Sequence, residues 1–125
     1  MSHLDEAFYQ QDEVRMLATV TLELATLMGA SPEPQQAALD QAEAALAELV
    51  AGGHPPPADL AAKTAERIDA ERVGWAAIVA ELDELLALPA DVQAALGVDV
   101  AATTKRRAEA QMWVDAIDAV WPEGG

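Results

Sequence analysis

Apolar residues recur every three or four positions along most of the chain, which is the spacing of one face of an α-helix. This period predicts five helices, with bounds near 5–28, 32–51, 58–88, 90–96 and 99–120. We expect the first helix to end at Gly29, because glycine readily takes the left-handed backbone that often closes a helix. The second should end at Gly52 and Gly53, and the fourth at Gly97. Pro89 should end the third helix, since proline cannot continue the hydrogen-bond ladder.

Each predicted helix carries its apolar residues in a stripe along one face, and these stripes indicate how the helices pack. Trp75 and Ile78 lie on the stripe of the third helix, and Trp113 and Ile117 lie on that of the last. Short connections favour antiparallel neighbours, so the predicted fold is an all-α, up-down bundle of four main helices plus one short helix. The alternative is a helical hairpin that projects from a smaller bundle and needs a partner or a second copy to cover its stripe.

The composition agrees with a single helical domain. The 125 residues are 52% hydrophobic but only 4% aromatic, and alanine and leucine favour helices over strands. A chain of this length can bury its own core. We therefore predict one acidic domain over 1–125, with a stiff proline-rich connector at 54–57 and a flexible tail at 122–125.

Several classes of protein are excluded or disfavoured by what the sequence lacks. There are no cysteines, which rules out disulfides, thiolate nucleophiles and cysteine-based metal sites. The first residues lack the basic and apolar regions of a signal peptide, and no apolar run reaches the roughly 20 residues of a membrane span. The predicted location is cytoplasmic.

The net charge indicates which classes of partner the protein could bind. The chain has 22 acidic and 7 basic residues, for a net charge of −15, which disfavours direct binding to nucleic acid or anionic membranes. Residues 1–62 hold ten acids and one base (−9), and the rest hold twelve and six (−6). Such a surface would attract a basic protein. Solubility, a saline origin or mimicry of a phosphate backbone would also account for the acidity.

Some charges fall within or beside the apolar stripes. They are Glu6, Glu13, Glu71, Arg72 and Arg106. Ionised groups are seldom fully buried unless paired, so these residues predict either an interhelical pocket for a small ligand or a structural ion-pair network. Side chains at the edge of a wide stripe are a third interpretation.

Catalytic motifs give no support to a particular enzyme. A dimetal bundle needs Glu-x-x-His pairs, and neither His3 nor His54 follows a glutamate by three residues. The acidic pairs at 66–69 and 81–84 resemble the type of magnesium motif in all-α nucleotide pyrophosphohydrolases. Their order is reversed, however, and both lie on one helix facing away from Trp75, as on a solvated face. We predict no cofactor, no metal and no catalytic residue.

The preferred function is therefore a non-enzymatic protein–protein interaction module that docks on a basic partner. An accessory subunit, an inhibitor or immunity-type protein and a virion or mobile-element component all fit this description. Phe8, Leu22 and Trp121 are the candidate apolar anchors of the interface. A homo-oligomer remains open. The alternative function is a helical-bundle enzyme or ligand-binding protein that uses the Glu/Arg pocket.

Overall fold

The computed structural model describes residues 3–121, which form five helices and no strands. The helices are α1 (His3–Met28), α2 (Glu33–Ala51), α3 (Leu60–Ala87), α4 (Ala90–Leu96) and α5 (Val100–Val120). The all-α helical bundle is thus confirmed, with bounds within two residues of the expected ones. The predicted flexible tail at 122–125 lies outside the described residues.

Local chemistry explains where the helices stop. Gly29 (φ 70°) and Gly97 (φ 72°) both follow a helix in left-handed backbone. In each case the next residue, Ala30 or Val98, donates its N–H at 2.9 Å to a carbonyl five residues earlier, which closes the helix end. Leu88 is extended because it precedes Pro89, and α3 ends at the residue before it.

The start of α2 differs from the expectation. The expected bound at 32 made Pro32 the first residue of this helix, a position that proline often occupies. Instead Pro32 occupies the cap position, α2 begins at Glu33, and no side chain caps the helix. The last helix does begin with a side-chain cap, since Asp99 accepts a hydrogen bond from the Ala102 N–H at 3.0 Å.

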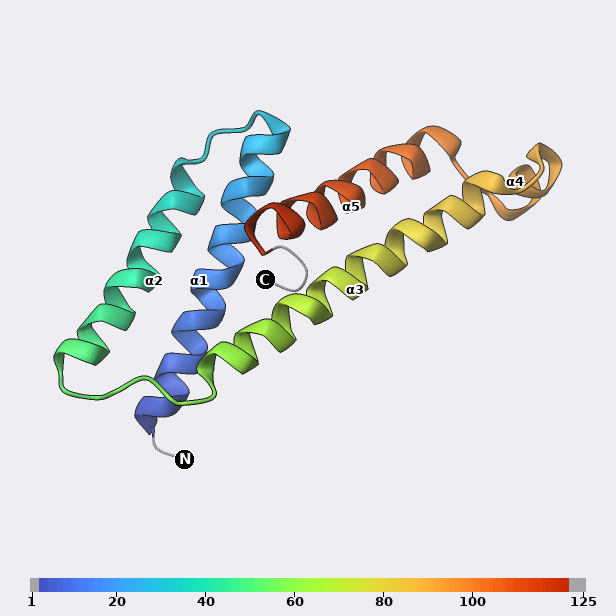
Figure 1. The fold of residues 1–125 in the computed structure, drawn as a ribbon. Helices are drawn as coiled ribbons and strands as arrows, with labels where there is room; N and C mark the ends of the chain where they lie inside the picture. The colour runs from blue at the N-terminus through green and yellow to red at the C-terminus, as the bar shows by residue number, and fades with distance from the viewer. Residues whose placement is uncertain (1–2, 122–125) are drawn as a thin grey trace.

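The helices are arranged as two hairpins that cross (Figure 1). α1 packs against α2 on one side and against α5 and α3 on the other, while α3 runs beside α5. The core lies where α1, α3 and α5 meet and is formed by Met16, Val20, Ile68, Ala116 and Ile117. Beyond this crossing the α3–α5 hairpin extends away from α1 and α2, with α4 at its far end (Figure 1). No helix within the described residues is long and apolar enough to cross a membrane.

Candidate interaction surfaces

The first polar cluster joins α1 to α3 around a buried carboxylate. Asp12 is only 5% exposed, accepts a hydrogen bond from the Thr64 hydroxyl and pairs with Arg15 at 2.8 Å. Sequence reasoning missed Asp12, although it lies four residues after Phe8 and four before Met16, on the buried line of α1. Arg15 lies on α1 itself, so the hydrogen bond from Thr64 on α3 is the contact by which Asp12 links the two hairpins.

A second group of contacts surrounds the start of α3. The Tyr9 hydroxyl donates to Asp59 Oδ1 at 2.5 Å, and Lys63 Nζ lies 4.8 Å from the centre of the Tyr9 ring. The hydrogen bond to Asp59 raises the pKa of Tyr9 to about 12. Nearby Glu13 pairs with Arg67, and both side chains are partly exposed. Glu13 thus belongs to an ion pair at the α1–α3 seam.

Arg72 fastens α3 to the end of α5. It is only 12% exposed, and it contacts Asp118 at 2.9 Å, Asp69 at 2.8 Å and the Trp121 carbonyl oxygen. A cation close to the last carbonyls of a helix is favoured by the helix dipole. Its carboxylate partners are Asp69 and Asp118, and neither belongs to the five charged residues that the sequence predicted for a pocket or ion-pair network.

The predicted charges do not gather in one pocket. Glu6 is exposed in the first turn of α1, and Glu13 and Arg72 are occupied in the separate contacts described above. Glu71 borders a hollow on α3, whereas Arg106 borders a different hollow between α3 and α5. The structure therefore does not bring these five residues into one pocket, although the hollows beside Glu71 and Arg106 adjoin each other at Trp75 and Ile78.

The predicted anchors also require a correction. Phe8 is 1% exposed and stacks on the His54 ring with centroids 5.9 Å apart, so its expected exposure is wrong. The connector after α2 covers this side of α1, which the helical period alone could not show. Leu22 is half-buried, and Trp121 is half-buried against the core at the end of α5.

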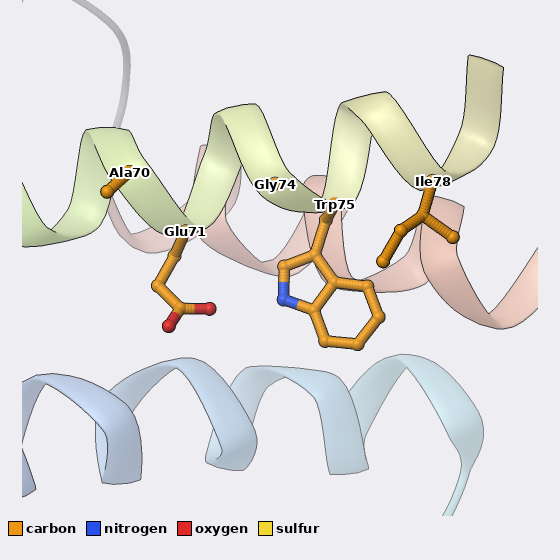
Figure 2. Close-up of a pocket in the computed structure, with 5 residues that line it drawn as sticks. All are labelled: Ala70, Glu71, Gly74, Trp75 and Ile78. Carbon is orange, nitrogen blue, oxygen red and sulfur yellow. The ribbon is translucent and has the colours of Figure 1, made fainter. Parts of the chain in front are cut away.

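The structure places an apolar surface elsewhere, on the α3–α5 hairpin. Trp75 and Trp113 stack with ring centroids 4.8 Å apart and 2° between their planes. A hollow of about 340 Å³ lies beside this pair, and a second of about 300 Å³ lies on α3. Trp75 and Ile78 border both, so the two hollows form one continuous surface. Figure 2 shows Glu71, Trp75 and Ile78 leaving α3 on the same side.

The second distinctive surface is the outer face of α2. Ala42 is the only buried residue of this helix, and its carboxylates, Glu33, Asp40, Glu43 and Glu48, are all exposed. Glu48 lies at the edge of this face, where it borders a hollow together with Ala7 and Gln11 of α1. α2 contains no basic residue. Among the described residues no ion pair involves these four groups, and Asp40 accepts a hydrogen bond from Gln36 at 2.9 Å.

Metal chemistry receives no geometric support in the part of the chain that the structure describes. No three of its acidic or histidine side chains are grouped so that they could hold a metal ion. The acidic residues of the 66–69 and 81–84 pairs are exposed along α3. Glu81 borders the hollow beside Trp75, so the expectation that both pairs face away from Trp75 is wrong for this residue. Comparison of the chain with protein-family models, with curated proteins and with solved structures finds no match.

Proposed function

We propose that this protein is a non-enzymatic interaction module that docks on a basic protein through the acidic outer face of α2. The observation that carries the proposal is the uncompensated charge of Glu33, Asp40, Glu43 and Glu48. Exposed carboxylates with no cation among them create a negative potential that speeds encounter with a positive surface and disfavours acidic competitors.

The distribution of the basic residues supports the choice of α2. Arg15, Arg67, Arg72 and Arg107 all pair with carboxylates on α1, α3 or α5. Acidic groups on those helices are therefore partly neutralised within the molecule, whereas those of α2 are not. An accessory, inhibitory or mobile-element role and a cytoplasmic location belong to the same proposal and rest on the sequence alone.

The test begins with capture from a lysate of the source organism at low salt. We expect a basic protein bound in a fixed stoichiometry, and its dissociation constant should rise as salt screens the interaction. Replacing Glu33, Asp40, Glu43 and Glu48 by their amides should weaken that complex by about tenfold or more, through loss of steering and rim contacts.

A matched control variant distinguishes the effect of the α2 face on binding from the effect of the total charge of the protein. The control carries Glu66→Gln, Glu84→Gln, Asp91→Asn and Asp115→Asn, which also removes four exposed charges. Asp91 lies in the first turn of a helix, as Glu33 does, and Asp115 accepts from Gln111 as Asp40 does from Gln36. Equal weakening by both sets would contradict docking on α2.

A further inference from the structure

The surface around Trp75 has the build of a docking site. Its centre is apolar: Ile78 is 39% exposed, and the stacked Trp75 and Trp113 are half-buried beside it. Ala70 and Gly74 form the adjoining part of α3, where an added Cβ at Gly74 would meet nothing within 4 Å. Short side chains next to a large ring leave a depression along the helix that a second helix can fill.

The rim of this surface is acidic. Glu71 borders the hollow on α3, and Glu81, Glu109 and Arg106 border the hollow between α3 and α5. All four side chains are exposed, and within the described residues no ion pair involves them. Three carboxylates and one guanidinium around an apolar centre favour a partner that carries positive charge beside its apolar face.

The surface area of the molecule is consistent with an uncovered interface. The chain exposes 7638 Å², whereas a compact monomer of its mass, 13.2 kDa, would expose about 6,400 Å². The excess of about 1,200 Å² is comparable to the roughly 800 Å² that each partner buries in a standard complex. The extension of α3 and α5 beyond α1 in Figure 1 is one source of this area.

We infer that the Trp75–Ile78 surface, bordered by Glu71, Glu81, Glu109 and Arg106, binds a basic amphipathic helix of the partner. The inference rests on the proposed function and supplies the apolar anchor that Phe8, being buried, cannot provide. The apolar side of the helix packs on Ile78 and the indole of Trp75. Its lysine or arginine side chains face the three carboxylates, and one of them lies near the electron-rich ring. A second copy of this chain fits less well, since it would bring one acidic rim towards another.

The probe is a synthetic helical peptide of leucine and lysine, about 18 residues or five turns long, with its leucines on one face. Calorimetry gives the dissociation constant, and tryptophan emission reports on the surface because the peptide contains no tryptophan. We expect Ile78→Gln to weaken binding by about tenfold. Glu71→Gln should weaken it about threefold and more strongly at low salt. A peptide of the same composition without an apolar face should bind at least tenfold more weakly.

Two control variants have the same chemistry on the opposite side of α3. The first is Val73→Gln, five residues before Ile78, and the second is Glu66→Gln, five residues before Glu71. Each control residue is about 140° around the helix from its test residue. Val73 is apolar and β-branched like Ile78, and at 67% it is the more exposed of the two. A weaker peptide affinity for Ile78→Gln than for Val73→Gln would therefore come from the position on α3 and not from exposure or residue type. Circular dichroism checks that every variant is folded. Equal affinities for Ile78→Gln and Val73→Gln would overturn the inference.

The remaining outcomes separate this inference from the proposed function. If the amide variant of α2 weakens binding of the captured partner while Ile78→Gln leaves peptide and partner affinities unchanged, the inference fails and the function stands. If the peptide result holds but no basic partner depends on α2, the proposed function fails. A stable dimer in sedimentation that Ile78→Gln converts to a monomer would assign the surface to a second copy, which would also overturn the inference.

Discussion

The fold raises the pKa of the Tyr9 hydroxyl. This hydroxyl donates to Asp59, and this hydrogen bond raises the pKa from 10.0 to about 12. The folded protein therefore holds the proton more tightly than the unfolded chain does. The associated stabilisation is complete below pH 10 and is lost as the pH rises from 10 to 12.

The sequence contains a single tyrosine, so tyrosinate absorbance reports on Tyr9 alone. We expect a midpoint near 12 in folded protein, with folding at each pH checked by circular dichroism. Asp59→Asn should move the midpoint towards 10, because the negative charge and the carboxylate acceptor are both removed. Asp91→Asn, on α4, is the control and should leave the midpoint unchanged. A midpoint near 10 in the wild type would show that the hydrogen bond does not form in solution.

At the scale of single side chains, sequence reasoning found the apolar positions better than the polar contacts. The period identified Ile117, which is a core residue, and Trp75 and Trp113, which pack against the core. It could not show that Phe8 is covered by the connector or that Asp12 is paired under α3, because both depend on which helix crosses which. The partner of Glu13 is Arg67, and this contact is set by the crossing of α1 and α3, which the sequence does not give.

At the scale of elements, helix ends were predictable because they are governed by local backbone chemistry. Gly29, Gly97 and Pro89 end helices as their residue types require. The stripe of α3 was also recognised, but the sequence left open whether the bundle covers it or a projecting hairpin leaves it exposed. Within one continuous stripe, Ile68 is buried at the crossing with α1, while Ile78 is left exposed beyond it. The angle at which α3 crosses α1 decides this difference, because the two helices diverge beyond the crossing (Figure 1), and periodicity carries no information about that angle.

Two glycines should respond oppositely to substitution by alanine. Gly97 has a φ of 72°, so Gly97→Ala should destabilise the fold by about 1 kcal/mol through left-handed strain. Gly74 lies inside α3, and its added Cβ would meet nothing within 4 Å, so Gly74→Ala should stabilise by up to about 1 kcal/mol through helix propensity. Urea unfolding monitored by circular dichroism measures both changes. Changes of the same sign would contradict this account of the backbone.

For the whole molecule, the arrangement of charge is as informative as the total of −15. The arginines are mostly committed to ion pairs within the α1, α3 and α5 assembly, and α2 has no cation of its own. Exposed ion pairs such as Glu13–Arg67 contribute little individually. Repulsion among the remaining carboxylates acts over the whole surface and opposes the compact state.

Salt should therefore stabilise the isolated protein even though it weakens the proposed complex. Raising the ionic strength from about 0.01 M to 0.5 M shortens the screening length from roughly 30 Å to below 8 Å, which removes most repulsion between exposed carboxylates. A gain of about 1 kcal/mol would raise the melting temperature by roughly 4 °C for a chain of this size. Calorimetry at several salt concentrations measures the shift, and the amide variant of α2 should show a smaller one than the wild type. A melting temperature that falls with salt would mean that the ion pairs of α1, α3 and α5 outweigh the repulsion among the carboxylates.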